Sequence, residues 1–189
     1  LAAIVVMGRG RLAARRGGER AIERQGAQMN PLPAEIDSRT AAIEAWRNAL
    51  LALPESRPQQ IWLIDRDFEA WPFADAAVIE AMSAWIRLQG RRITWIAADF
   101  EAVERAHPRL ARWRRLYAHG VEAYRPVEGE QIGWPCWLIV ERTAVVLDDR
   151  ERWHGRTIRE PAALRAMREE VDALLQRCEP AWPGTTLGL

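Results

Sequence analysis

The sequence contains no lysine, because all 27 basic side chains among its 189 residues are arginines. Chemistry that needs an amine is therefore excluded, including Schiff-base formation, a phosphate-loop lysine and a lysine general base. Histidine is also scarce. The three histidines are His107, His119 and His154. None of them are spaced like two metal-binding histidines on one helix, as in H-x(3)-H.

Cysteine and long apolar runs are equally sparse. Cys136 and Cys178 lie far apart, which predicts reduced thiols in a core and argues against a disulfide framework or a metal clip. No run approaches the 18 or so apolar residues that span a bilayer, and the opening LAAIVVMG is too short for a signal-peptide core. An arginine-only composition is typical of GC-rich bacterial genomes. We therefore expect a bacterial cytoplasmic protein without a membrane partner.

The composition divides the chain into an arm at 1–36, a single domain at 37–178 and a tail at 179–189. Residues 1–28 hold six arginines against two glutamates and are rich in glycine, which predicts disorder. This arm is either a basic segment that contacts phosphates or, in part, a mis-assigned start, and we favour a true start at Met29. The rest of the chain holds 21 arginines and 24 acidic side chains, so we do not expect a nucleic-acid partner.

Apolar periodicity from residue 37 onward predicts an α/β fold. Two successive βα units imply parallel strands with right-handed crossovers, and the later strands extend the same sheet as a hairpin that turns at Glu141. The prediction is one mixed sheet sandwiched by helices. The predicted helices cover 37–54, 74–90, 100–120 and 160–178. The predicted strands cover 60–65, 91–99, 121–126 and two runs within 136–149.

Acidic side chains follow two of these strands. The first strand runs into Asp65, Asp67 and Glu69, in IWLIDRDFEAWPF at 61–73, and a later strand ends in VVLDD at 145–149. This pair of motifs resembles the haloacid dehalogenase-type phosphatases. The resemblance implies that Asp65 attacks phosphorus, that Asp67 handles the leaving-group proton and that the pair Asp148 and Asp149 holds Mg²⁺. That family also uses a lysine beside the phosphate, which this chain lacks.

A second resemblance covers residues 60–178 and rests on element order. The order is similar to one half of the phospholipase D-like fold, whose signature H-x-K-x(4)-D would fall on Trp134, Cys136 and Glu141. Both the nucleophilic histidine and the phosphate-binding lysine are missing, so two-step phosphodiester transfer could not run. The resemblance therefore implies a degenerate half-domain, akin to uncharacterised proteobacterial relatives, that pairs as a homodimer.

Several residues remain as candidates for binding a ligand. The segment HPRLARWRRLYAH at 107–119 mixes arginines with aromatic side chains, although Leu110, Trp113 and Tyr117 share one helical face that predicts a core role. His154 lies near two aspartates, and Trp134 precedes a proline in a loop. Trp182 in the tail could dock on the domain or bind another chain. The ligand-binding candidates are Arg109, Arg112, Arg115, Trp134 and His154.

The sequence favours a non-catalytic binding or interaction module with an unknown ligand or protein partner. In that interpretation no residue is catalytic and no metal or cofactor is bound. The alternative is a magnesium-dependent phosphohydrolase with Asp65 and Asp67 as catalytic residues and Asp65, Asp67 and Asp149 as metal ligands.

Overall fold

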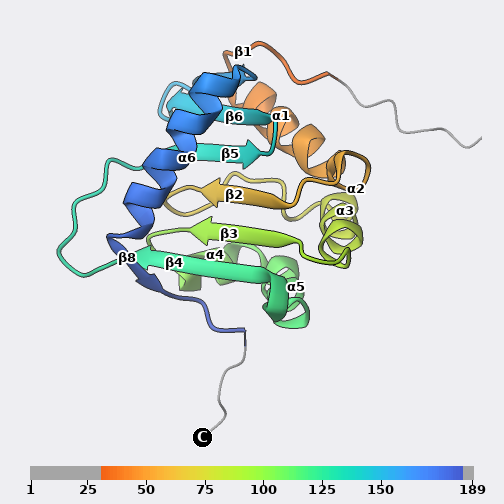
Figure 1. The fold of residues 1–189 in the computed structure, drawn as a ribbon, viewed down its shortest axis with the longest axis vertical. Helices are drawn as coiled ribbons and strands as arrows, with labels where there is room; N and C mark the ends of the chain where they lie inside the picture. Colours follow the sequence, from red (N-terminus) through yellow and green to blue (C-terminus); the bar gives the residue numbers. More distant parts are fainter. Residues whose placement is uncertain (1–30, 185–189) are drawn as a thin grey trace, which may run out of the picture.

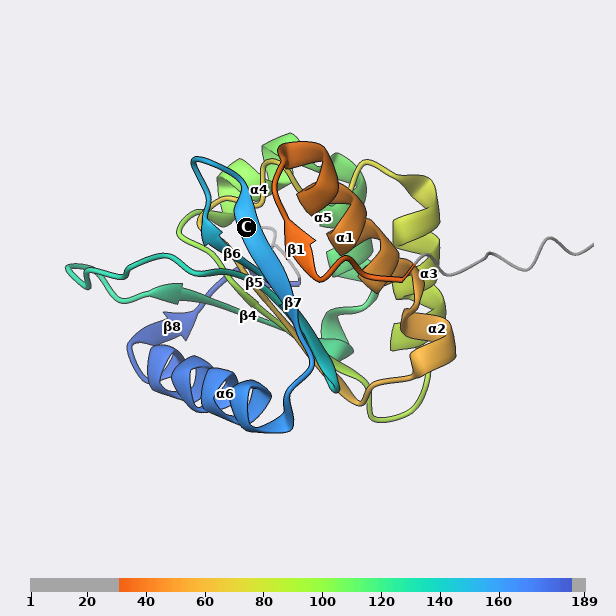
Figure 2. The ribbon, with the colours of Figure 1, turned by 90° about the horizontal axis from the view of Figure 1, so that it is seen from above.

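A single eight-stranded sheet lies between helices in the computed structural model, which describes residues 31–184. The strand order is β1-β7-β6-β5-β2-β3-β4-β8 (Figure 1). Seen along the sheet, α6 covers one face, while α1 to α5 cover the other (Figure 2). The predicted α/β fold with one mixed sheet sandwiched by helices is confirmed.

The elements follow one another in alternation through the first two thirds of the described chain. The strands are β1 (Glu35–Ile36), β2 (Gln60–Ile64), β3 (Arg92–Ile96), β4 (Val121–Pro126), β5 (Cys136–Val140), β6 (Thr143–Asp149), β7 (His154–Ile158) and β8 (Cys178–Pro180). The α-helices are α1 (Arg39–Leu51), α2 (Leu53–Ser56), α3 (Ala76–Ile86), α4 (Phe100–Ala106), α5 (Pro108–Leu116) and α6 (Pro161–Leu175), and a 3₁₀ turn covers Ala118–Gly120.

The centre of the sheet is parallel, as two successive βα units require. β2 pairs with β3 and β3 with β4, both parallel, and the connecting helices α3, α4 and α5 lie on the same face. β5 and β6 form the predicted hairpin, in which Val140 pairs with Thr143 across a two-residue turn. Because β5 runs antiparallel to both β2 and β6, it begins at the edge where those two strands end.

Short polar side chains start three of the helices. Ser38 accepts a hydrogen bond from the backbone N–H of Ala41 at the start of α1. Asp75 and Asp99 cap α3 and α4 in the same way. The helix predicted over 100–120 is divided into α4 and α5, because Pro108 occupies the first turn of α5, where its missing N–H is not needed.

Three short strands lie where the sequence analysis placed none. β1 begins before the expected domain start at 37 and β8 extends past its expected end at 178, so the sheet is wider than 37–178 on both sides. In β7, with the sequence HGRTI, every residue before Ile158 is exposed or half-buried, so the sequence has too few apolar residues to predict a strand. The rest of the predicted arm, residues 1–30, and residues 185–189 lie outside the described part of the chain.

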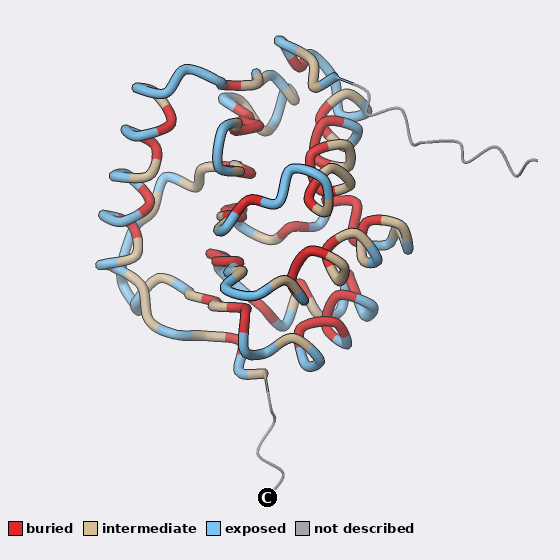
Figure 3. The backbone as a smooth tube through the Cα atoms, turned by 45° about the vertical axis from the view of Figure 1, so that its right-hand side comes forward, coloured by how far each residue is buried: buried red, intermediate tan, exposed pale blue. Residues whose placement is uncertain are grey.

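Two apolar clusters fill the spaces on either side of the sheet. The larger lies under α1 to α5 and contains most of the tryptophans, while the smaller lies under α6. Figure 3 shows buried residues on the helix sides that face the sheet and exposed residues on the outward sides. Trp46, Trp85, Trp95 and Trp113 are buried, whereas Trp62 and Trp137 are half-buried beneath α6.

Within residues 31–184, no helix combines the length and apolar character needed to cross a bilayer. Both cysteines are free thiols, with Cys136 buried and Cys178 half-buried.

Gly155 allows β6 and β7 to approach, and replacing it should weaken the sheet. A methyl group there would lie 2.1 Å from the carbonyl oxygen of Val146 and 2.9 Å from the Cα of Leu147, and neither backbone atom can move aside without breaking the pairing. We expect Gly155→Ala to lower the free energy of unfolding by about 2 kcal/mol in urea titrations. Gly133→Ala is the control, since nothing lies within 4 Å of its added methyl. Equal effects of the two changes would contradict this explanation.

Candidate functional site

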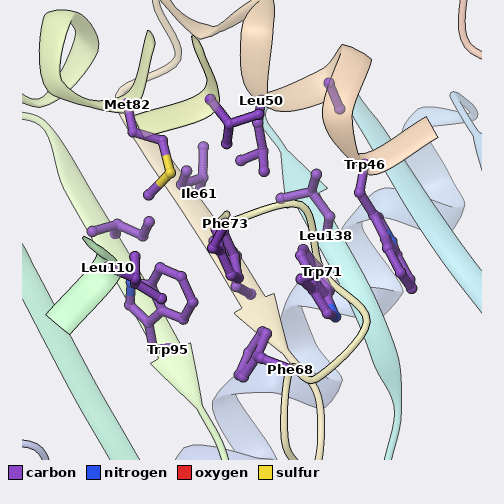
Figure 4. Close-up of a cluster of buried hydrophobic side chains, with 14 of the residues drawn as sticks. Trp46, Leu50, Ile61, Phe68, Trp71, Phe73, Met82, Trp95, Leu110 and Leu138 are labelled. Atoms are coloured by element: carbon purple, nitrogen blue, oxygen red, sulfur yellow. The ribbon is translucent and has the colours of Figure 1, made fainter. Parts of the chain in front are cut away.

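The segment after β2 folds back and inserts three aromatic side chains into the core. We call its residues 68–73 the aromatic plug. Phe68, Trp71 and Phe73 point into the larger core cluster between Trp46 and Trp95 (Figure 4). The Trp71 ring stacks on the Trp46 ring, with centroids 4.5 Å apart and planes within 5° of parallel. Phe68 adopts a left-handed backbone with φ of 55°, which is costly for a bulky side chain and is held here by complete burial.

Asp65 lies at the carboxyl end of β2 and is 1% exposed. Its Oδ2 accepts hydrogen bonds from the indole Nε1–H of Trp71 at 2.6 Å and from the thiol of Cys136 at 3.3 Å. Its Oδ1 accepts a hydrogen bond from Nη1 of Arg150 at 2.6 Å. Every oxygen of this carboxylate is therefore engaged by a donor from the protein itself.

The strand order explains why these donors meet. β2 and β6 end at the edge of the sheet where β5 begins, so Asp65 follows β2, Cys136 opens β5, and Arg150 follows β6. The guanidinium of Arg150 reaches across the start of β5 and also binds Asp67 through Nη2. Arg150 thus binds two carboxylates, Asp65 and Asp67, at the ends of the central strands, and we call these three side chains the clamp.

The two clamped carboxyls differ in their pKa values. Burial raises the pKa of Asp65 above its ordinary value, and the Arg150 charge with the Trp71 and Cys136 hydrogen bonds offsets only part of that rise. Burial also acts to raise the pKa of Asp67, but the Glu69 backbone N–H and the Arg150 guanidinium outweigh it and lower that pKa. Burial together with the Asp65 charge raises the pKa of the Cys136 thiol well above its usual range, which favours the protonated thiol over the thiolate.

Asp67 and Glu69 take local roles at the rim of the plug. Oδ1 of Asp67 accepts the backbone N–H of Glu69 at 3.0 Å, which forms a turn within the segment. The helix that follows is capped by Asp75 instead, whose Oδ1 accepts the N–H of Ala77. Asp67 does not cap this helix, because the aromatic plug lies between Asp67 and Asp75.

The later acidic pair is directed to other arginines. Asp148 forms an ion pair with Arg156 across β6 and β7. Asp149 accepts the backbone N–H of Arg152 at 3.0 Å. Within residues 31–184, no group of three or more His, Cys, Asp and Glu side chains is arranged to hold a metal ion.

The five ligand-binding candidates do not form one site. Arg109, Arg112 and Arg115 lie on the exposed side of α5, and Arg109 donates to the carbonyl of Ala74 at 3.1 Å. Trp134 is half-buried against the cluster under α6. His154 opens β7, where it is exposed and pairs with Asp149 in the sheet register.

The predicted tail docks on the domain. We call residues 180–184, which begin at the last residue of β8, the carboxyl-terminal strap. Trp182 in the strap is buried, stacks on Phe100 with centroids 4.9 Å apart and donates its indole N–H to Glu104 at 2.6 Å. A cavity of about 500 Å³ lies beside it at the carboxyl ends of β3 and β4, with Arg115 and Arg125 on its wall. From the sequence, Trp182 could dock on the domain or bind another chain. In the structure it docks on the domain.

The residues that organise this region were not predicted from the sequence. Arg150 directly follows the two aspartates that were considered as metal ligands, yet it forms ion pairs with the earlier pair, Asp65 and Asp67. Cys136 was expected in a core, and no polar partner was predicted for it or for Trp71. The available signal was that an aspartate follows one strand and an arginine follows another. A predicted strand order that brings those two strand ends to the same edge would have indicated the ion pair.

Comparisons with known proteins find a solved structure with a similar fold. Neither a protein-family model nor a curated protein matches the sequence. A solved structure that is similar is that of TrmBL2, an archaeal chromatin protein that shows a novel mode of DNA binding. The TM-score is 0.56 at 10% sequence identity, over 85% of this chain and 57% of TrmBL2. This chain thus spans little more than half the length of that protein.

Removing Arg150 should leave the Asp65 charge buried and uncompensated. We expect Arg150→Met to lower the free energy of unfolding by about 3 kcal/mol, at the lower end for a broken buried pair because the arginine is a third exposed. Asp65→Asn in the same background should recover part of the loss, since an amide needs no counter-charge. Urea unfolding of the two single variants and the double variant measures the coupling.

Arg156→Met removes an exposed ion pair with Asp148 and serves as the control, with an expected change below about 1 kcal/mol. Additive effects of the Asp65 and Arg150 changes would show that the clamp is not a coupled pair.

The clamp should also give opposite pH dependences for its two carboxyls. The folded-state pKa of Asp67 is lowered, so its ionised form stabilises the fold above the unfolded value of about 4, and this contribution is lost as the pH falls through the folded value. The stability advantage of wild type over Asp67→Asn should therefore shrink on acidification.

For Asp65 the folded-state pKa is raised, so wild type should lose stability relative to Asp65→Asn as the pH rises from about 4 through the folded value. Urea unfolding at a series of pH values tests both slopes, and slopes of the same sign would rule out this assignment.

Proposed function

We propose that this chain is a non-catalytic binding or interaction module, arranged like a degenerate half of the phospholipase D-like fold and working in a bacterial cytoplasm. The observation that carries the proposal is the state of Asp65. An aspartate at the carboxyl end of a central strand occupies the place where α/β enzymes put reactive groups. Here its two oxygens accept hydrogen bonds from Arg150, Trp71 and Cys136, and only 1% of the residue is exposed.

The neighbouring residues support the same conclusion. A magnesium-dependent phosphohydrolase needs carboxylate oxygens free to reach a hydrated cation and a phosphate. The guanidinium of Arg150 already forms ion pairs with Asp65 and Asp67, and Asp149 lies within ion-pair distance of Arg152. The raised pKa of Cys136 argues against thiol chemistry at the position that corresponds to the phospholipase D signature lysine.

A protein or small-molecule partner fits the charge of the domain better than nucleic acid does. Residues 31–184 hold fewer arginines than acidic side chains, so the domain lacks the positive excess that phosphate backbones require. The DNA binding reported for TrmBL2 belongs to that protein, and the 10% identity gives no residue-level support for it here. By analogy with the complete enzymes, two copies of the chain would pair about a two-fold axis.

Magnesium binding and hydrolysis test the proposal together. We expect no saturable heat on titrating Mg²⁺ into the protein and no Mg²⁺-dependent hydrolysis of p-nitrophenyl phosphate or bis(p-nitrophenyl) phosphate. Asp67→Asn is the matched control, because it keeps the shape of the rim while removing one carboxylate. Hydrolysis by wild type that disappears in Asp67→Asn would overturn the proposal and favour the phosphohydrolase. Light scattering of the same sample reports whether the chains pair.

A further inference from the structure

Arg114 is a buried cation, and two of its guanidinium nitrogens have no hydrogen-bond partner within residues 31–184. Only 6% of the residue is exposed, and Nε and Nη1 are out of contact with solvent and have no acceptor among the described residues. No carboxylate in residues 31–184 forms an ion pair with it. Its neighbours Arg112 and Arg115 on α5 are exposed, so Arg114 differs from the rest of this arginine-rich helix. An uncompensated buried charge is strongly unfavourable, and a structural role would not require one.

The carboxyl-terminal strap covers this guanidinium. The ring of Trp182 lies 5.9 Å from Cζ of Arg114, a cation–π contact that offsets part of the cost of burial. A methyl group added to Gly184 would lie 2.9 Å from Nη1 of Arg114, so the backbone of the strap passes directly over the charge. Trp182 has a left-handed φ of 49°, a strained conformation for a tryptophan. Figure 1 shows the strap leaving β8 at the edge of the sheet.

Arg114 also lines a cavity of about 430 Å³ beside β4. The floor is the first part of that strand, and Pro180, Ala181 and Pro183 of the strap form the opposite wall. One acidic residue, Glu122, lines the cavity, and its carboxylate lies 3.5 Å from Arg92, which balances its charge. Tyr124 is the remaining polar side chain of the lining. The cavity therefore contains one positive charge that the described residues leave unneutralised.

We propose that this cavity is a binding site for an organic monocarboxylate with a small apolar body, with Arg114 as the partner of the carboxylate. One unneutralised charge matches one carboxylate, because a dianion would carry a second charge toward Glu122. A guanidinium pairs well with a carboxylate. Because Nε and Nη1 are closed off from solvent, the carboxylate would approach the guanidinium from its cavity side. The rest of the lining, Val121, Ala123 and the prolines of the strap, suits a short hydrocarbon chain. This inference rests on the proposed role as a binding module and names the ligand class for it.

Butyrate is the probe, and thermal unfolding of the full chain is the first measurement. A ligand that binds only the folded state raises the Tm in a saturable way. We expect sodium butyrate to raise the Tm above that in sodium chloride of equal ionic strength, and butanamide to have no effect. In Arg114→Met we expect the Tm without butyrate to equal or exceed that of wild type, because the uncompensated cation is gone, and butyrate affinity to fall at least about tenfold.

Arg112→Met is the matched control, since Arg112 lies two residues away on the exposed side of α5 and should leave the butyrate effect unchanged. An acetylated valyl-alanine with a free carboxyl group, compared with its carboxamide, distinguishes a free acid from a peptide terminus as the natural source. Binding of the acid form more tightly than butyrate would identify a peptide terminus.

A Tm that butyrate does not raise, or raises equally in Arg114→Met, would overturn the site. If Arg114→Met does not fold, the indole N–H resonance of Trp182 in wild type carries the test, and it must shift with butyrate and not with butanamide. Failure here leaves the binding module with another ligand, whereas Mg²⁺-dependent hydrolysis would refute the module whatever butyrate does.

Discussion

The buried carboxylate of Asp65 is the constraint around which the central edge of the sheet is built. A charge that is removed from water must be matched by donors, and the fold supplies them from three separate places in the chain. Trp71 donates from the segment after β2, Cys136 from the start of β5 and Arg150 from the end of β6. Each of these elements is thereby held in register with the others. An apolar residue at position 65 would leave the Arg150 guanidinium and the Trp71 indole without their acceptors.

The same contact connects the polar clamp with the aromatic core. Trp71 donates to Asp65 with its indole nitrogen and stacks on Trp46 with its ring. The aromatic contacts continue from Trp71 through Phe73 to Trp95, and from there to Trp182 in the strap. The two regions proposed to differ in role, the closed clamp and the Arg114 cavity, are therefore joined by one continuous row of rings. Rigid packing of this kind favours a fixed scaffold that presents a site at its border.

Sequence reasoning succeeded where one local signal decides the structure. Continuous apolar runs predicted β2 and β3, and the polar break at Glu141 predicted the β5–β6 hairpin. It failed where a residue acts through a distant partner. Nothing adjacent to Arg150 in the chain indicates that its acceptor is Asp65, 85 positions away, and the aromatics of FEAWPF follow no period that would predict a buried plug. β1 and β8, with two and three residues, are too short for any pattern.

The distribution of helices leaves the two faces of the sheet unequally protected. Within residues 31–184, five helices cover one face, while α6 alone covers the other through Leu164, Met167, Val171 and Leu174. Beneath α6 lie side chains from strands across the middle of the sheet, among them Ile64, Ile96 and Ile139. Undocking of α6 would expose this apolar surface on several strands to water in one step, and no second helix of the described residues lies on that face to limit the exposure. Resistance to aggregation in this fold depends on how firmly a single 15-residue helix stays in place.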